Sequence, residues 1–354
     1  MEYKIGTETH NSFLNFELAN SAKKLVKDIM LVKDKETVAI TADTSSDWRV
    51  VQATANAVYC VGAEPVAILY ETRPNVSMEP PSPVSGALKN ADVWIEFSVS
   101  YILHSEAYKQ SLKTGCRYIC LSGMDVLMMV NTIGRVNYSK IIELGGALRA
   151  LISNANEVKI ESPGGTDLIG YNEGRKVRLS GKLADTKGEP IMLGGQISWC
   201  PIEETIEGTL VFDGTLWPPD SLGKLKSPVR LTLKEGIIRE ITGGYEAKIF
   251  EKWLSSFNDP NMYRLAHYSL GFNPGVTELT GRIVEDERLF GCIEFGIGSQ
   301  GAQIMGKTFS AAAHTDGVVI MPSIILDGEM IEKDGKYMHQ DLIKLCQDLG
   351  VWGY

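Results

Sequence analysis

The chain has few of the residues and loops that mark common cofactor and metal sites. It contains five histidines and six cysteines among 354 residues. The cysteines form no Cys-x-x-Cys pair, which excludes zinc-ribbon and thioredoxin-type sites. Residues 1–150 contain neither a Gly-x-Gly-x-x-Gly loop nor a Walker loop, so a bound dinucleotide or nucleoside triphosphate is not indicated. The candidates for a chemical role are therefore few, and the histidines come first among them.

Basic clusters and long apolar runs are absent as well. The formal net charge is -9 and lysines and arginines form no cluster, which argues against nucleic acid as a partner. No apolar run approaches the roughly 20 residues that span a bilayer, so no membrane partner is expected. The first residues lack the basic and apolar layout of a signal peptide. These features predict a cytoplasmic protein.

The scattered cysteines predict free thiols. Cys116 and Cys120 lie in a predicted strand, where residues four apart share a face but are roughly 13 Å apart. That separation is too large for a disulfide. We therefore expect all six cysteines to be reduced and buried.

The first part of the chain, residues 1–152, predicts an α/β domain. Helical and strand-like segments alternate there, which favours a parallel sheet with helices on both faces. The predicted helices cover residues 13–30, 47–61, 86–90 and 108–114, and the predicted strands cover 37–42, 65–70, 91–97 and 115–121.

The second part, residues 153–354, predicts a β-rich α+β domain that carries the metal site. Glycine pairs and Asp-Gly or Glu-Gly turns multiply there, beside strand-like runs, which is typical of antiparallel hairpins. One hairpin is predicted over 231–241, turning at Glu235-Gly236. A single helix is predicted over 247–257 and a strand over 318–326.

The tripeptide His314-Thr315-Asp316 carries the strongest chemical signal. On an extended backbone residues i and i+2 point to the same face, so His314 and Asp316 would project together from an apolar strand. A carboxylate in such a place needs a positive partner, and a divalent metal is one. His267 would complete two histidines and one carboxylate, the facial triad of iron(II) enzymes. A simple hydrogen-bonded His–Asp pair is the alternative.

Several segments then point to a family. They are Glu207-Gly-Thr-Leu-Val211, Gly243-Gly-Tyr-Glu-Ala247, Phe257-Asn-Asp-Pro260, Tyr263, His267, Gly271 and Pro274, and the stretch from His104-Ser105 to Leu112-Lys-Thr-Gly115. In these the chain resembles the 2,5-dihydroxypyridine 5,6-dioxygenases, non-haem iron(II) ring-cleaving enzymes of nicotinic-acid breakdown. The resemblance covers most of the chain and is strongest from about residue 205 to 275. More distantly, the chain is similar to the thermophilic-type metallo-aminopeptidases, in the His-x-Asp and in the pattern that ends Gly296-Ile-Gly298.

The resemblance implies a site and its ligands. The iron ligands fall on His267, His314 and Asp316, with Fe(II) as the cofactor and Zn(II) or Mn(II) as the alternative. His104 matches a histidine beside the substrate pocket, where it would bind the substrate or move a proton, and Leu103 would be an apolar wall. The expected reactants are O2 and a hydroxylated N-heteroaromatic ring. A homo-oligomer is expected because the resembled families are multimeric.

The chain departs from both families. At the aminopeptidase metal positions it has Gln196, His267 and Glu294, which disfavours a two-metal site. Glu294 is therefore an additional acid, and it could be a fourth ligand, a general base or a salt-bridged core residue. A hydrolase that uses a metal-activated water, with Glu294 or Glu278 as the base, is the second hypothesis. A metal-stabilised binding protein is the third. Residues 179–193 contain no histidine, which leaves the identity of the substrate open.

Overall fold

The chain forms two compact units in a computed structural model that describes residues 10–301 and 306–354. The first unit comprises residues 1–138 and 181–194, and the second comprises 139–180 and 195–354. The sequence-based boundary at residue 152 differs from this division in two places. Helix α6 (Tyr138–Asn154) lies almost entirely in the second unit. Residues 181–194, beyond the predicted boundary, belong to the first unit.

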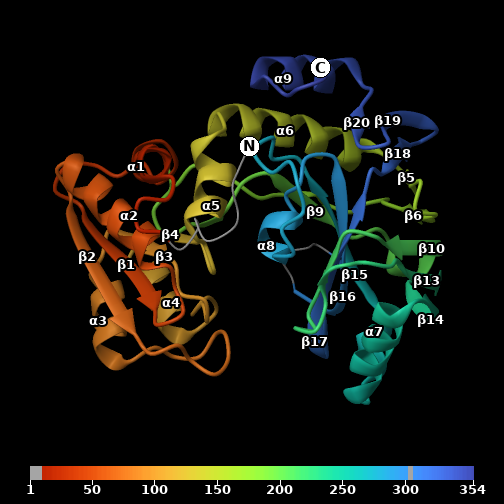
Figure 1. The fold of residues 1–354 in the computed structure, drawn as a ribbon, viewed down its shortest axis with the longest axis horizontal. Helices are drawn as coiled ribbons and strands as arrows, with labels where there is room; N and C mark the ends of the chain where they lie inside the picture. Colours follow the sequence, from red (N-terminus) through yellow and green to blue (C-terminus); the bar gives the residue numbers. More distant parts are fainter. Residues whose placement is uncertain (1–9, 302–305) are drawn as a thin grey trace. The chain divides into compact units, whose positions relative to one another are not determined.

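A five-stranded parallel sheet forms the centre of the first unit (Figure 1). Its order is β2-β1-β3-β4-β8, and all four neighbouring pairs are parallel. The strands are β1 (Thr37–Asp43), β2 (Glu64–Tyr70), β3 (Val93–Glu96), β4 (Arg117–Cys120) and β8 (Pro190–Met192). The predicted parallel sheet is confirmed. Strand β8 was not predicted, since three residues carry too little pattern to mark a strand.

Helices connect these strands as the alternating pattern predicts. They are α1 (Asn15–Lys24) with the π-turn η1 (Leu25–Ile29), α2 (Trp48–Cys60), α3 (Ser82–Lys89), α4 (Glu106–Lys113), α5 (Val126–Met129) and the π-turn η2 (Val130–Gly134). Helices α3 and α4 pack on one face of the sheet through an apolar cluster that includes Leu88, Tyr108, Trp94 and Tyr118. Among the helices described, none has both the length and the apolar character needed to cross a membrane.

The second unit contains two antiparallel sheets. One has eight strands in the order β14-β13-β10-β6-β5-β18-β19-β20, and the other has seven in the order β12-β11-β17-β16-β15-β9-β7. The strands of the eight-stranded sheet are β5 (Glu157–Glu161), β6 (Asp167–Tyr171), β10 (Glu207–Phe212), β13 (Val229–Lys234), β14 (Ile237–Gly243), β18 (Ser323–Leu326), β19 (Glu329–Lys333) and β20 (Lys336–Tyr337). The strands of the seven-stranded sheet are β7 (Arg178–Leu179), β9 (Gln196–Trp199), β11 (Thr215–Trp217), β12 (Gly223–Lys224), β15 (Leu265–Gly271), β16 (Cys292–Gln300) and β17 (Phe309–Ile320).

Turn chemistry explains where two of these strands begin and end. Glu235 and Gly236 have φ values of 54° and 68°, the left-handed pair that closes a two-residue hairpin, so β13 and β14 form the predicted hairpin. The strand predicted over 318–326 is instead two strands. Met321 has a φ of 49° and precedes Pro322, and this bend ends β17 in one sheet before β18 begins in the other.

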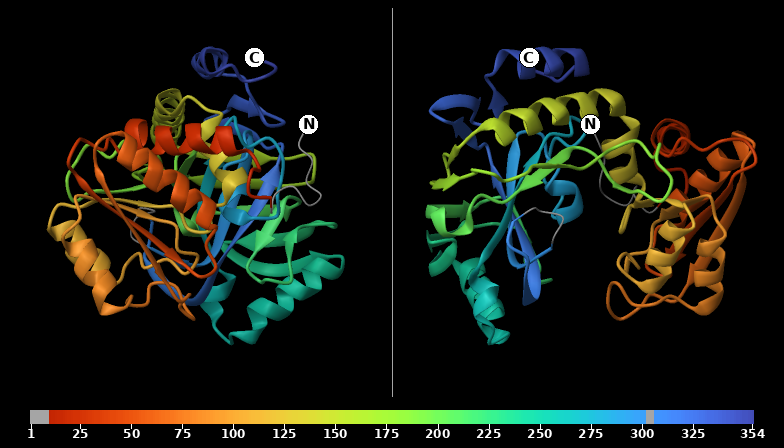
Figure 2. Two further views of the ribbon diagram at one scale, coloured as in Figure 1. Left: turned by 60° about the vertical axis from the view of Figure 1, so that its left-hand side comes forward. Right: turned by 180° about the vertical axis from the view of Figure 1, so that it is seen from behind.

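Helix α6 packs closely onto the seven-stranded sheet, and the right-hand view of Figure 2 shows it running across the strands of the second unit. The contact depends on Gly145, where a Cβ atom would lie 2.5 Å from Leu179 Cδ1 and 2.8 Å from Phe272 Cζ. Three further α-helices lie in the described part of the second unit. They are α7 (Tyr245–Ser256), close to the predicted 247–257, the short α8 (Ile283–Asp286), and α9 (Gln340–Leu349) near the C-terminus.

The cysteines follow the prediction only in part. All six are free. Cys60 is exposed on α2 and Cys120 is half-buried at the end of β4, so the expectation of complete burial is wrong at these two positions. The reason is local: Cys60 ends its helix on the solvent side, which the average preference of the residue does not reveal.

A buried carboxyl group organises the loop that follows β3. Glu96 is fully buried and accepts hydrogen bonds from the backbone N–H of Ile102 at 2.8 Å and from the hydroxyl of Tyr118. Burial raises the pKa of Glu96 to about 7, and the charge of Asp43 adds to this effect, although the two hydrogen bonds oppose it. Glu96 therefore holds the loop in place and keeps its proton up to a higher pH than carboxyl groups usually do.

We predict that Glu96 makes the protein less stable as the pH rises from about 4.5 to about 7. In this window the unfolded chain has released the proton that the folded chain still holds, so the free energy of unfolding falls, in total by about 3 kcal/mol. Glu96→Gln has no such proton. Urea unfolding at pH 5 and pH 8 should show the variant gaining stability relative to wild type at the higher pH. Equal differences at both pH values would contradict this prediction.

Candidate metal centre

Three neighbouring strands, β15, β16 and β17, bring the predicted ligands together. His267 on β15 lies opposite Gly296 on β16, and Gly296 lies opposite Asp316 on β17. Directly opposed residues in antiparallel strands project from the same face of a sheet. His314, two residues before Asp316 on the same strand, shares that face. The predicted extended geometry of the His-x-Asp is thus confirmed.

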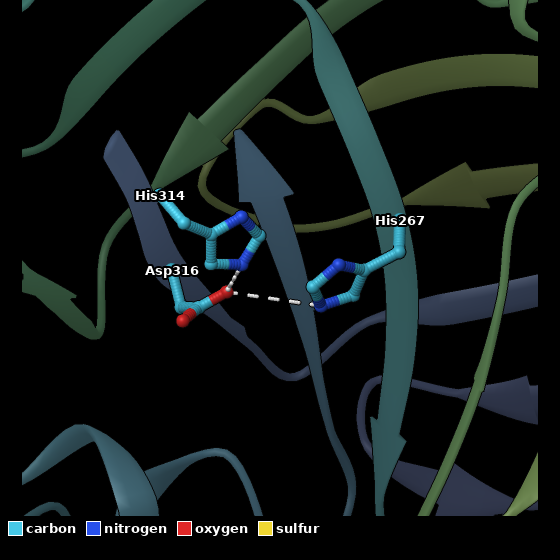
Figure 3. Close-up of side chains that lie close together, drawn as sticks. All are labelled: His267, His314 and Asp316. Atoms are coloured by element: carbon cyan, nitrogen blue, oxygen red, sulfur yellow. Dashed lines mark hydrogen bonds and ion pairs between the residues drawn. The ribbon is translucent and has the colours of Figure 1, made fainter. Parts of the chain in front are cut away.

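The three side chains converge on one point (Figure 3). One ligand atom from each of His267, His314 and Asp316 lies within 4.8 Å of the other two. His314 Nε2 is 2.8 Å from Asp316 Oδ1, and His267 Nε2 is 3.7 Å from the same oxygen. The two imidazole rings are stacked, with centroids 5.3 Å apart and planes inclined by 15°. Among the described residues, this is the group of histidine, cysteine and acidic side chains that could hold a metal ion.

Gly296 makes room for the two imidazoles. A Cβ atom at this position would lie 2.2 Å from Cε1 and 2.4 Å from Nδ1 of His267, and 2.8 Å from Cε1 of His314. These separations are far below van der Waals contact, and the rings cannot move apart without leaving Asp316. The two imidazoles can therefore meet only because residue 296 of β16 has no side chain.

The hydrogen bonds of His314 test whether the residues fit a metal. Its Nδ1 lies 2.8 Å from the carbonyl oxygen of Ser299, which can only accept, so Nδ1 donates. In a neutral ring Nε2 then carries a lone pair, and this lone pair faces Asp316 Oδ1. Two acceptors repel each other unless a proton or a cation lies between them. Donation of the second ring N–H to a backbone carbonyl is the usual arrangement of a metal-binding histidine, so these residues fit a divalent metal.

Burial and neighbouring charges set the protonation of the three groups. Burial of Asp316 opposes its ionisation, but His314 and His267 outweigh burial and hold the pKa of Asp316 at about 2. Burial lowers the pKa of His267. Burial also disfavours the charged form of His314, yet the Asp316 carboxylate outweighs it and raises the pKa of that ring. The site therefore combines a stable carboxylate with nearby positive charge, which a bound cation would replace.

Two further acids lie near the three side chains. Glu294 is on β16, two residues before Gly296, and its Oε2 is 3.2 Å from His267 Nε2. Burial, followed by the charge of Asp316, raises the pKa of Glu294 well above its usual range. Burial likewise raises the pKa of Glu287, although the adjacent Arg288 pairs with it and works in the opposite direction.

The other sequence-based candidates are not members of this group. Leu103 and His104 belong to the first unit, where Leu103 is buried and His104 is exposed. Glu278, the alternative base of the hydrolase hypothesis, is exposed in the loop after β15. Gln196 is buried on β9, where Gly271 of β15 lies opposite. An amide there cannot supply the acid of a two-metal aminopeptidase site.

Sequence reasoning missed two residues of the site. It gave Gly296 no role, although Gly296, Gly298 and Gly301 have the spacing of a dinucleotide loop; the first two lie within β16 rather than in a turn between a strand and a helix. It also assigned Trp217 to the core or to a subunit contact. Trp217, on β11, lies opposite Asp316 of β17, is 41% exposed, and donates its indole N–H to Asp220. The positions of Gly296 and Trp217 become apparent only from the pairing register of neighbouring strands, which the sequence of one strand does not determine.

Comparison with protein families tests the family membership that the motifs predicted. The sequence profile described as 2,5-dihydroxypyridine 5,6-dioxygenase matches residues 24–339. The chain belongs to this family. The resemblance predicted from the motifs is therefore confirmed.

The individual relatives share little sequence identity with this chain. The 2,5-dihydroxypyridine 5,6-dioxygenase of Pseudomonas putida is 26% identical over 191 residues, which cover 53% of this chain and 52% of that protein. The match thus spans about half the length of this curated relative. A solved structure of 2,5-dihydroxypyridine dioxygenase from Pseudomonas putida has a TM-score of 0.75 at 20% identity, covering 94% of this chain and 99% of that one.

A second solved structure shares the fold. Wild-type AmpT from Thermus thermophilus has a TM-score of 0.66 at 13% identity, covering 92% of this chain and 100% of that one. The predicted similarity to the aminopeptidase-like fold is confirmed at this level. At such low identity the match describes the path of the chain and not its chemistry.

We predict that Gly296→Ala weakens metal binding by at least tenfold while the fold persists. The added methyl group overlaps both imidazoles, and overpacking of this kind costs about 1–3 kcal/mol. Titration of the metal-free protein with Mn(II) would measure the loss. Gly146→Ala on α6 is the control, because a Cβ there meets nothing within 4 Å. Wild-type affinity in Gly296→Ala would show that the rings do not need this space.

Proposed function

We propose that the protein is a non-haem Fe(II)-dependent dioxygenase that opens the ring of a hydroxylated N-heteroaromatic compound such as 2,5-dihydroxypyridine. The product would be of the N-formylmaleamate type, with both oxygen atoms of O2 inserted. The observation that carries this proposal is the convergence of His267, His314 and Asp316 in a chain of this family. In the proposal these three side chains hold Fe(II), and Zn(II) or Mn(II) is the alternative.

The ligand set suits this chemistry. Two neutral imidazoles and one carboxylate leave open positions on the ion and one unit of positive charge. Fe(II) held there would supply the redox chemistry that brings O2 and an electron-rich ring to react. The hydrogen bond from His314 to the Ser299 carbonyl fixes the orientation of that ring and, in the neutral form, leaves on Nε2 the lone pair that a metal would bind. Burial of His267 has the same consequence, because it disfavours the imidazolium.

The loop of the first unit that carries His104 supports a role in substrate binding. His104 has a φ of 73°, a left-handed conformation that few residues other than glycine adopt. Glu96 holds this loop through the N–H of Ile102, and Ser105 caps α4 directly after His104. Strained backbone is kept where surrounding structure enforces it, often at functional positions. We therefore assign His104 to substrate binding or proton transfer, with Leu103 as its apolar neighbour.

Oxygen consumption tests the proposed function. Protein purified without oxygen should contain about one iron per chain and should consume O2 when 2,5-dihydroxypyridine is added. His267→Ala, His314→Ala and Asp316→Ala should each lose iron and oxygen uptake, since removing one of three ligands abolishes the site. Their thermal unfolding without metal should remain cooperative, which shows that the fold survives.

Other outcomes would redirect the assignment. Full iron content and activity in any of the three variants would remove that residue from the ligand set. About two zinc or manganese ions per chain without oxygen use would overturn the dioxygenase and favour a hydrolase. The location in the cytoplasm and a homo-oligomeric state remain predictions.

We predict that His104→Asn lowers kcat/KM for the ring substrate by at least tenfold without changing iron content. Asparagine tolerates a positive φ, so the loop keeps its conformation while the imidazole is lost. Steady-state kinetics together with iron analysis would measure both effects. His339→Asn is the matched control, because His339 caps α9 and asparagine also caps helices well. Unchanged kinetics in His104→Asn would exclude His104 from the reaction.

A further inference from the structure

Glu294 lies on the ligand-bearing face of the seven-stranded sheet. It is two residues from Gly296 on β16, so both positions project from the side that carries His267 and Asp316. The side chain has no exposed surface. Its Oε2 lies 3.2 Å from Nε2 of His267, the nitrogen that also faces Asp316.

Protein contacts satisfy only one of the two oxygens of this carboxyl group. Glu294 Oε1 is buried and has no hydrogen-bond partner among the described residues. Of the nearby acids, Asp316 shares a hydrogen bond with Glu294 but is itself an anion, and Glu287 already pairs with Arg288. A buried polar oxygen without a partner is costly, and buried acids in proteins are paired or coordinate metals. A cation on the side of His267 would supply the partner that Oε1 of Glu294 lacks.

Two of the interatomic distances are close to those between neighbouring metal ligands. Atoms at adjacent corners of an octahedron with bonds of about 2.1 Å lie about 3 Å apart. The Glu294 Oε2 to His267 Nε2 distance of 3.2 Å falls close to that value. The distance between His314 Nε2 and Asp316 Oδ1, 2.8 Å, does so as well. Glu294 thus has the same relation to His267 that Asp316 has to His314.

We propose that Glu294 is a fourth protein ligand, so that this chain binds its metal through two imidazoles and two carboxylates. The inference rests on the metal site of the proposed function and adds to its ligand set. It separates this chain from the two-histidine, one-carboxylate arrangement that the family resemblance implies.

The fourth ligand would change three properties of the site. Two carboxylates neutralise a divalent ion, where one leaves a unit of positive charge. With four protein ligands instead of three, the ion would have one open position fewer for the substrate and O2. Carboxylate oxygen also favours harder ions, which should shift selectivity from Zn(II) toward Fe(II) and Mn(II).

The test compares metal binding in matched variants of the full chain. Glu294→Gln keeps the shape and removes the charge, and Glu294→Met removes both oxygens with little change in length. Glu332→Gln is the control, because Glu332 is an equally buried acid without hydrogen-bond partners, on β19 in the other sheet. Mn(II) affinity is measured by competition with a chelator. The visible spectrum of the Co(II) form reports coordination number without any need for activity.

We expect at least tenfold weaker Mn(II) binding in both Glu294 variants, a changed Co(II) spectrum, and wild-type values for Glu332→Gln. Thermal unfolding with chelator present should show both Glu294 variants folded, since replacing a buried charge by a group of similar volume is often neutral or stabilising. Wild-type affinity and spectrum in Glu294→Gln and Glu294→Met, with binding lost in His267→Ala, would overturn this inference and leave the proposed site intact. No Mn(II) or Co(II) binding to the wild type would overturn both.

Discussion

The register of three antiparallel strands is the constraint on which the candidate metal centre depends. Because β15, β16 and β17 align His267, Gly296 and Asp316 in one row, two imidazoles and a carboxylate meet above a residue without a side chain. A slip of one residue in either pairing would turn one ligand to the opposite face of the sheet. The spacing of the ligands is thus a property of the sheet, and the loops between the strands contribute little to it.

Two buried glutamates show how the same side chain serves different purposes. Glu96 in the first unit accepts bonds from Ile102 and Tyr118, so both of its oxygens have partners and its role is to hold a loop. Glu294 in the second unit has one imidazole beside it and an oxygen without a partner. Burial raises the pKa of both, and only the list of partners separates a structural acid from one placed for a ligand.

Much of the fold and of the candidate site could be predicted from the sequence. The features that were missed all depend on contacts between segments that are distant in the chain. The parallel sheet and the shared face of His314 and Asp316 follow from local patterns of a few residues. The addition of His267 came from family resemblance, because no local rule connects it to β17. Gly296 and the short strand β8 were missed since their roles arise from partners distant in the chain. For Glu294 the sequence left three roles open, and the distance to His267 is what narrows them.

The order of strands in the second unit has a consequence for how the protein folds. The chain enters and leaves the two sheets in alternation: β10 belongs to one, β11 and β12 to the other, β13 and β14 to the first again, and β15 to β17 to the second. Neither sheet can therefore form from a continuous stretch of chain. Contacts between distant segments slow folding, because the chain loses the entropy of loop closure before strand pairing stabilises the structure. During synthesis, the seven-stranded sheet stays incomplete until β17 has emerged, so the candidate ligands meet only near the end of assembly.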